Sequence, residues 1–146
     1  ARDRDRIRVS IDGGDEPVMV DEGRLILLLK NLLGNALRYS KPEDGPVELG
    51  FERHPERLRI RVRDHGPGIP PEQVPHLGEP FFRGDPSRTR GTGGSGLGLY
   101  LSKLVAEAHG GQLRLLDDVD DGACFEVVLP LAPSRTPAAR RAAAAA

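Results

Sequence analysis

Residues 22–40 carry the pattern that most restricts how this chain can fold. Leucine, isoleucine and alanine fill two adjoining faces of a helix that would begin after the N-cap Asp21 and end before Pro42. A helix that is apolar over so much of its circumference must be buried against another layer of the protein. The predicted inner faces consist of Leu25, Leu29, Leu32 and Ala36, with Ile26, Leu33 and Leu37 beside them.

Apolar residues that recur at every second position supply that layer, because such alternation predicts half-buried strands. A second helix, from about Leu97 to His109, is stopped by Gly110 and Gly111, and a short one is expected around Glu72–Leu77. Together these elements predict an α+β fold: a two-layer α/β sandwich whose mixed, mostly antiparallel sheet is covered on one face by helices. The predicted strands are Ile7–Ile11, Val18–Val20, Val47–Arg53, Arg57–Asp64, Gln112–Leu116 and Ala123–Leu129, the third and fourth forming a hairpin.

The size and charge of the chain narrow its function. Its 146 residues fit one domain, which we expect at residues 1–132 with a core at about 7–131, followed by a disordered or non-native tail at 133–146. The net charge of -1 gives no long-range attraction to nucleic acid or anionic lipid. The longest apolar run, Leu25–Leu29, is far below the roughly 20 residues that cross a bilayer, so we expect a soluble chain. The single Cys124 cannot form an intrachain disulfide and is expected in the core.

Three polar residues interrupt the apolar faces of the first helix. Asn31, Asn35 and Arg38 fall within about 60° of one another on a helical wheel. They could simply form the solvent-facing side of the helix. A solvent-facing side usually carries lysine and glutamate, however, whereas paired asparagine carbonyls suit Mg²⁺ shared with substrate phosphates, and an arginine suits a phosphate. The stripe therefore indicates a candidate site for a metal and a phosphate.

Asp64 has the parity of the inward-facing residues on its predicted strand. Leu58, Ile60 and Val62 point to the core, so a carboxylate two residues later lies at the core edge, where it needs hydrogen-bond donors. The exocyclic amino group of a purine would be one such donor. Alternatively, Asp64 ends the strand and caps the next turn. The glycines within residues 65–70 would let the backbone pass close to a flat ligand.

The glycine-rich segment 91–99 runs directly into the second predicted helix. Free N–H groups at the start of a helix bind anions, so this segment is typical of a phosphate site. Its glycines and Asp117 also fit a dinucleotide-binding pattern, but residues 81–86 before it do not form the buried strand that this pattern requires. No lysine follows the glycines, as a Walker loop would need. A flexible linker is the remaining alternative, although a linker seldom joins paired aromatics and an arginine to a helix.

Four segments, in this order, resemble the N, G1, F and G2 boxes of sensor histidine kinases. The resemblance covers roughly residues 7–131, and an ordered set of four boxes is far more specific than any one of them. It implies a Bergerat ATP-binding fold, shared with gyrase-type ATPases and heat-shock chaperones, with a mobile ATP lid between about Arg83 and Gly96. The four segments are Asn31–Ser40, Asp64–Ile69, Phe81–Asp85 and Gly91–Leu99.

The resemblance also implies the cofactors, ATP and Mg²⁺, and a role for each matching residue. Asn35 would bind the metal with help from Asn31, and Arg38 would contact a phosphate. Asp64 would accept a hydrogen bond from the adenine amino group, and Arg83 would reach the terminal phosphates. Asn31, Arg38 and Arg83 are therefore the predicted catalytic residues. The predicted nucleotide-binding residues are Asn35, Tyr39, Asp64, Gly66, Gly68, Ile69, Phe82, Gly94, Ser95, Gly96, Leu97, Gly98 and Leu99.

Asn31 favours a kinase over an ATPase within this resemblance. The related ATPases carry at this position a glutamate that activates water, whereas an amide is a poor general base, so hydrolysis should be slow. The histidine that accepts the phosphoryl group lies in a helical box in the family, and none of the four histidines here has that context. We therefore expect the chain to bind Mg-ATP without phosphorylating itself. The four histidines are His54, His65, His76 and His109.

The resemblance further implies partners outside this chain. The γ-phosphoryl group would pass to a histidine on dimerisation helices, and then to a response regulator. A homodimer is expected only in the full-length protein, as is attachment of this cytoplasmic domain to a membrane-anchored sensor, and no nucleic acid is involved. Two alternatives stay open: an anti-sigma-type protein serine kinase of the same fold, and a degenerate module that binds nucleotide or partner helices without transferring a phosphoryl group.

Overall fold

The computed structural model describes residues 4–14, 18–76, 79, 98–116 and 121–131. Segment 80–97, which carries the predicted lid, and tail 132–146 lie outside the described residues, so the domain limits and the lid stay predictions. The strands and the long helices are β1 (Ile7–Asp12), α1 (Glu22–Tyr39), β2 (Val47–Arg53), β3 (Arg57–Asp64), α3 (Gly98–Ala108), β4 (Gln112–Leu116) and β5 (Ala123–Pro130). Three short 3-10 helices are η1 (Arg4–Arg6), η2 (Pro42–Asp44) and η3 (Val74–His76).

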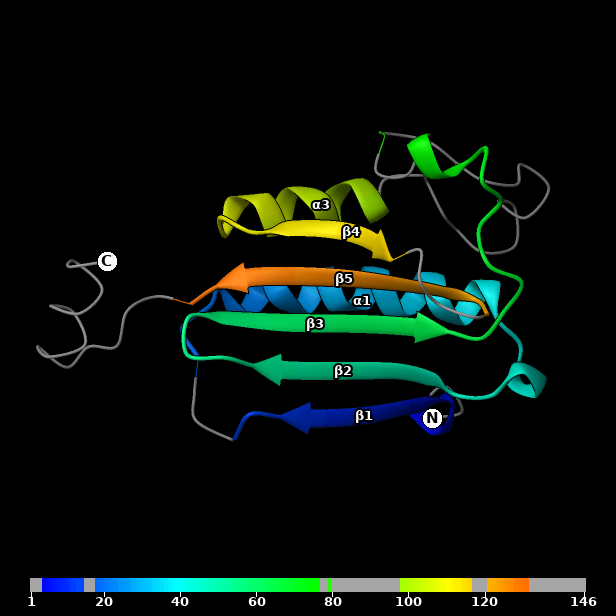
Figure 1. The fold of residues 1–146 in the computed structure, drawn as a ribbon, viewed down its shortest axis with the longest axis horizontal. Helices are drawn as coiled ribbons and strands as arrows, with labels where there is room; N and C mark the ends of the chain where they lie inside the picture. Colours follow the sequence, from blue (N-terminus) through cyan, green and yellow to red (C-terminus); the bar gives the residue numbers. More distant parts are fainter. Residues whose placement is uncertain (1–3, 15–17, 77–78, 80–97, 117–120, 132–146) are drawn as a thin grey trace, which may run out of the picture.

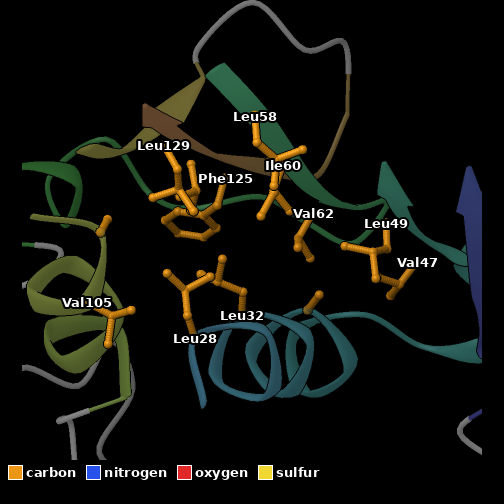
Figure 2. Close-up of a cluster of buried hydrophobic side chains, with 13 residues drawn as sticks. Leu28, Leu32, Val47, Leu49, Leu58, Ile60, Val62, Val105, Phe125 and Leu129 are labelled. Carbon is orange, nitrogen blue, oxygen red and sulfur yellow. The ribbon is translucent and has the colours of Figure 1, made fainter. Parts of the chain in front are cut away.

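One five-stranded sheet forms the first layer, in the order β1-β2-β3-β5-β4. β1 runs parallel to β2, and every other neighbouring pair is antiparallel, including the predicted β2–β3 hairpin. The helices α1 and α3 lie together on one face of this sheet (Figures 1 and 2). The predicted two-layer α+β architecture, with a mixed and mostly antiparallel sheet, is therefore confirmed.

The hydrophobic core lies between α1 and the inner face of the sheet (Figure 2). Leu28, Leu32 and Ala36 are buried on the helix side. On β3, burial alternates strictly: the side chains of Leu58, Ile60, Val62 and Asp64 are buried, and the arginines between them are half-buried or exposed. Leu28 was missing from the predicted inner faces, although it is fully buried. The remaining buried core residues include Val47, Leu49, Val105, Ala106, Phe125, Val127 and Leu129.

Both ends of α1 are fixed by side chains. The carboxylate of Asp21 accepts a hydrogen bond from the N–H of Arg24 at 3.1 Å, which confirms the predicted N-cap. The N–H of Asp21 donates to Nε2 of His109, so the start of α1 is tied to the residue that follows α3. At the other end, the guanidinium of Arg6 donates to the carbonyl oxygen of Ser40 at 3.1 Å. These contacts hold the polar stripe of α1 in a fixed position relative to the sheet.

Three local predictions differ from the structure. Residues 18–20 form no strand; Val18 instead packs against the core. The short helix expected around Glu72–Leu77 is only the 3-10 turn η3. On β1, Val9 and Ile11 point to the helix side of the sheet but are exposed, since this edge strand extends past the cover that α1 provides.

Two further predictions concern the burial of Cys124 and the absence of a membrane-spanning helix. Cys124 is buried, as expected. Among the described residues, no helix combines the length and the hydrophobicity that crossing a bilayer requires.

Candidate nucleotide site

The polar stripe of α1 faces the start of α3 and the end of β3. Asn31 and Asn35 are half-buried, and Arg38 is exposed and donates a hydrogen bond to Oδ1 of Asn35. A side chain added at Gly98 would come within 3.5 Å of Oδ1 of Asn31, so the first residue of α3 lies directly against this amide. Tyr39, at the end of α1, is exposed. The structure thus brings the predicted metal and phosphate residues together on one surface of the helix.

Asn31 carries an unsatisfied polar group. Its Nδ2 atom is buried and has no hydrogen-bond partner within the described part of the chain. Such a group costs about 1–3 kcal/mol unless it is paired, so it is retained where a ligand or another group completes its hydrogen bonding. The neighbouring amide oxygens of Asn31 and Asn35 are of the type that Mg²⁺ accepts when phosphates supply its other ligands. The donor set therefore fits a metal shared with a phosphate.

Asp64 is buried at the end of β3, with 5% of its surface exposed. Its Oδ1 atom accepts a hydrogen bond from the N–H of Gly66 at 3.0 Å, and the backbone of Ala123 supplies another. Burial raises the pKa of Asp64 above its ordinary value, and these two backbone hydrogen bonds only partly oppose that shift. The predicted inward parity is confirmed, and the turn contact to Gly66 is present as well. The carboxylate is thus available at the core edge for a donor from a ligand.

The loop after Asp64 passes very close to other backbone. A Cβ atom on Gly66 would lie 2.3 Å from the carbonyl oxygen of Tyr39, so this position requires glycine. Gly68 adopts a φ of +81°, the left-handed region that favours glycine. Ile69 then packs against the hydrophobic core. The loop after β3 therefore packs directly against the end of α1, and this contact places Asp64 and Tyr39 close together beside the polar stripe of α1.

Several predicted site residues cannot be placed by the structure. Leu99 is described and packs against the core, so any contact that it makes with a nucleotide stays a prediction. The same holds for the ligand roles of the glycines and of the α1 residues. The predicted residues that lie outside the described part of the chain are Arg83, Phe82, Gly94, Ser95, Gly96 and Leu97.

Sequence reasoning missed a group of charges next to the site. His65 lies between two carboxylates: its Nε2 is 2.8 Å from Oε2 of Glu48, and its Nδ1 is 3.1 Å from Oδ2 of Asp121. Nη2 of Arg63 donates to Asp121 at 2.9 Å. The partners are 17 and 56 residues away from His65 in sequence, so only the strand register reveals them.

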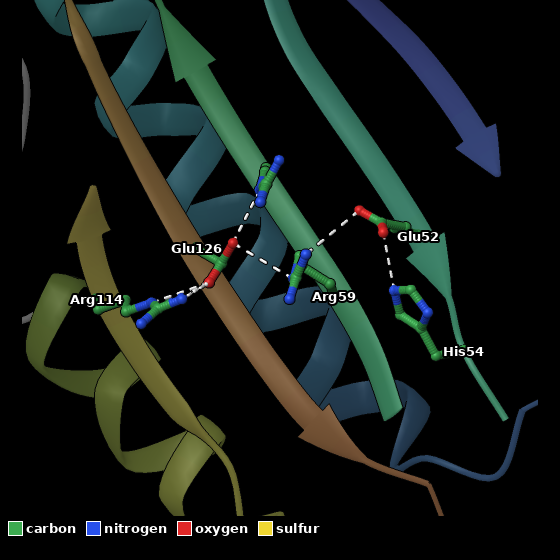
Figure 3. A network of polar contacts seen from close by, with 6 residues as sticks. Glu52, His54, Arg59, Arg114 and Glu126 are labelled. Atoms are coloured by element: carbon green, nitrogen blue, oxygen red, sulfur yellow. Dashed lines mark hydrogen bonds and ion pairs between the residues drawn. The ribbon is translucent and has the colours of Figure 1, made fainter. Parts of the chain in front are cut away.

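A second missed network lies on the outer face of the sheet (Figure 3). Glu126 is fully buried and accepts hydrogen bonds from Nε of Arg61 at 2.8 Å and Nε of Arg114 at 2.9 Å; Nε of Arg59 is 3.5 Å from it. Burial raises the pKa of Glu126, but the bonds from Arg61 and Arg114 outweigh it and leave the pKa below its ordinary value. The hydrogen bond to Glu126 also raises the pKa of Arg61. This network joins β3, β5 and β4 and is a structural feature.

Comparison with known proteins agrees with this geometry. Residues 20–133 match the family of histidine kinase-, DNA gyrase B-, and HSP90-like ATPases. Among solved structures, a mycobacterial sensor histidine kinase, MprB, superimposes with a TM-score of 0.67 at 30% identity, covering 91% of this chain and 89% of that one. A full-length ShkA structure in complex with AMPPNP gives a TM-score of 0.71 at 30% identity over 93% of this chain and 28% of that one.

Relatives identified by sequence are also named sensor histidine kinases. The sensor-like histidine kinase SenX3 of Mycobacterium tuberculosis (strain H37Rv) is 42% identical over 113 residues, 77% of this chain. The sensor histidine kinase YkoH of Bacillus subtilis (strain 168) is 46% identical over 98 residues, 67% of this chain. The chain spans 27% and 21% of the lengths of these two relatives.

The chain belongs to the histidine kinase-, DNA gyrase B-, and HSP90-like ATPase family. Within it, the resemblance to sensor histidine kinases is confirmed by the relatives and by the solved structures.

Proposed function

We propose that this chain is the ATP-binding catalytic domain of a two-component sensor histidine kinase, which binds Mg-ATP and directs the γ-phosphoryl group to a histidine on a separate dimerisation helix. The observation that carries the proposal is the buried carboxylate of Asp64, held by Gly66 beside the exposed end of α1. Membership of this ATPase family supports nucleotide binding. The relatives' names support a histidine as the acceptor over the serine of an anti-sigma-type kinase.

The adenine end of the site would be read by Asp64. A buried carboxylate can accept the hydrogen bond that an exocyclic amino group donates, and it would repel the carbonyl oxygen that guanine has at that place. The close approach of Gly66 to Tyr39 leaves no room for a side chain in the loop beneath the base. Preference for adenine therefore follows from Asp64 and the narrow loop beside it.

The phosphate end of the site would lie along α1. Oδ1 of Asn35 and Oδ1 of Asn31 would hold Mg²⁺ together with phosphate oxygens, and Mg²⁺ when bound would neutralise charge on the phosphates. Arg38 already donates to Oδ1 of Asn35, so it keeps this oxygen oriented and can itself reach a phosphate. These residues bind and orient the phosphates, and phosphoryl transfer depends mainly on positioning and charge neutralisation.

Asn31 would preserve the phosphoryl group from water. An amide cannot take a proton from an attacking water, so this position supplies no general base. The described part of the chain therefore orients the nucleotide without activating water at Asn31, and transfer awaits a nucleophile from elsewhere. The proposal thus predicts slow hydrolysis of bound ATP.

The acceptor histidine is proposed to lie outside this chain. His54 is paired with Glu52 in the β2–β3 hairpin, and His109 donates from Nδ1 to the carbonyl oxygen of Val105 at 2.9 Å while its Nε2 accepts from Asp21. None of the four histidines lies in an α-helix of the described structure, and His76 belongs only to the 3-10 turn η3. The dimerisation helices, a response regulator and a membrane anchor in the full-length protein belong to the same proposal.

The metal part of the proposal is tested by fluorescence titration with an ATP analogue, with and without Mg²⁺. Wild type should bind more tightly with Mg²⁺, and Asn35→Ala should lose most of that difference, because it removes a metal ligand. Lys30→Ala, an exposed change on the same helix, is the matched control and should keep it. An Asn35→Ala variant that folds and keeps the full Mg²⁺ effect would refute the metal assignment.

A further inference from the structure

His65 joins three separate parts of the chain next to the proposed adenine site. Glu48 lies on β2, His65 follows β3, and Asp121 lies in the turn before β5. We call this trio the His65 clamp. The His65 side chain is 24% exposed, and each of its two ring nitrogens faces a carboxylate oxygen, at 2.8 Å for Glu48 and 3.1 Å for Asp121.

The clamp is complete only when His65 is charged. A neutral imidazole has one N–H donor and one acceptor nitrogen, so it would turn a lone pair toward one of the two carboxylates. An imidazolium donates to both. The hydrogen bond to Glu48 and the contact with Asp121 accordingly raise the pKa of His65 above its usual 6.5, although partial burial opposes them. His65 and Arg63 in turn lower the pKa of Asp121.

The surrounding charges indicate which contact would break when the proton is lost. Arg63 also donates to Asp121 at 2.9 Å, so the position of this carboxylate depends on its contacts with both Arg63 and His65. Arg8 of β1 is in register with Glu48, and Asp64 and Asp44 are the nearby acidic groups. A neutral ring can keep its bond to Glu48 through Nε2–H, but its Nδ1 lone pair then faces Asp121. Deprotonation would therefore remove the contact from His65 to Asp121, leave the one from Arg63, and loosen the turn that contains Asp121.

That turn supports the adenine site through direct backbone contact. Gly122 follows Asp121 so closely against β3 that an added Cβ would lie 2.0 Å from the carbonyl oxygen of Asp64. An added Cβ at Gly68 would lie 3.1 Å from the carbonyl oxygen of Gly122. Ala123, the next residue, is paired with Asp64 in the sheet. A shift of the turn would thus move the support of both Asp64 and the glycine loop.

We propose that His65 is a positioning residue whose imidazolium, held between Glu48 and Asp121, fixes the Asp64 loop for nucleotide binding and makes nucleotide affinity decrease with rising pH. This inference rests on the proposed function, because it concerns the same nucleotide site. The sign follows from the ring: the clamp is closed below the pKa of His65 and opens as pH rises through it. Protonation of Asp64 would weaken binding only toward acid, so the two ionisations act in opposite directions.

The test compares nucleotide affinity between pH 6 and pH 9 for wild type and four variants, with one ATP analogue throughout so that its own ionisation cancels. Wild type should weaken about threefold to fivefold over this range, the size expected for a partly exposed ion pair. His65→Gln should be weak and nearly flat, and His65→Arg should be tight and nearly flat, because its charge does not titrate here. Asp121→Asn should reduce the pH dependence. His54→Gln, which breaks a 2.8 Å contact to Glu52 at the other end of β3, should match wild type.

A second measurement is independent of nucleotide. NMR of the imidazole ring, assigned by its loss in His65→Gln, should give a pKa above 6.5, and the amides of Gly66 and Gly68 should shift with the same midpoint. Identical pH profiles for wild type and His65→Gln, or an effect of equal size in His54→Gln, would overturn the inference. The inference would also be overturned if the amide shifts of Gly66 and Gly68 did not change with the titration of the His65 ring. If wild type binds no nucleotide at any pH, the proposed function itself fails, whatever the NMR titration shows.

Discussion

Asp64 lowers the stability of the folded protein at neutral pH, and its proposed role is to bind the nucleotide. Its carboxylate is buried and its pKa is raised, which means that the folded state disfavours the charged form of Asp64 relative to the unfolded state. A group with a raised pKa stabilises the fold most below its unfolded pKa, and that contribution is lost as pH rises through the folded value. At neutral pH Asp64 therefore costs stability, as is common for residues that are kept for binding.

Asp64→Asn should separate these two effects. The amide oxygen can still accept from Gly66, and no charge is buried, so the free energy of unfolding at pH 7 should be equal to or above that of wild type. Nucleotide affinity should fall by about tenfold or more, because a charge-assisted hydrogen bond is lost. Urea unfolding and nucleotide titration of the same samples check both halves. Asp12→Asn, at the exposed end of β1, is the control and should change neither.

At the scale of elements, the sheet depends on a charge network as well as on its core. Glu126 joins Arg61 of β3 to Arg114 of β4 across β5. Its lowered pKa means that it stabilises the fold above its unfolded pKa of about 4.5 and that this stability is lost as pH falls through its folded value. Glu126→Gln should lower the free energy of unfolding at pH 7 by about 2 kcal/mol, because its hydrogen bonds to arginine lose their charge, and should flatten its dependence on pH in the acid range. Unfolding curves from pH 3 to pH 7 measure this, and a variant with the wild-type acid profile would contradict it.

Two leucines of α1 test which face of this helix packs against the sheet. Leu32 is 1% exposed and Leu27 is 43% exposed on the same helix. Leu32→Ala should therefore cost about 2–5 kcal/mol of unfolding free energy, whereas Leu27→Ala should cost well under half of that. Denaturant titration compares the two. Equal losses would mean that α1 does not pack as described.

Sequence patterns predicted the parts of the fold that depend on single elements. The alternation in β3 predicted the inward parity of Asp64. Of the predicted inner faces of α1, Leu32 and Ala36 are buried, whereas Ile26 is 44% exposed. Contacts that depend on register between distant strands could not be foreseen, since Arg61 meets Glu126 only because β3 pairs with β5 in one particular alignment. The partners of His65, Glu48 and Asp121, could not be predicted either, because they are distant from it in sequence. Residues 18–20 show a second limit: a short apolar run predicts a strand, but here Val18 packs against the core outside the sheet.

At the scale of the whole molecule, the proposed function is that of a domain that binds and orients a nucleotide while a segment outside this chain supplies the acceptor histidine. We therefore expect no stable phosphohistidine when the chain alone is incubated with Mg-ATP, since its described histidines lie outside the α-helices and are engaged by carboxylates or backbone. Phosphohistidine-sensitive gel analysis under alkaline conditions checks this. A labelled histidine in this chain would show that the acceptor had been misplaced.

The most direct test of the central claim is calorimetric titration of the chain with non-hydrolysable analogues of ATP and of GTP in the presence of Mg²⁺. If Asp64 reads the adenine amino group, wild type will bind the ATP analogue at least about tenfold more tightly than the GTP analogue, and Asp64→Asn will lose most of that preference. Equal affinity for the two analogues in folded wild type, or an undiminished preference in Asp64→Asn, would contradict the assignment of this site.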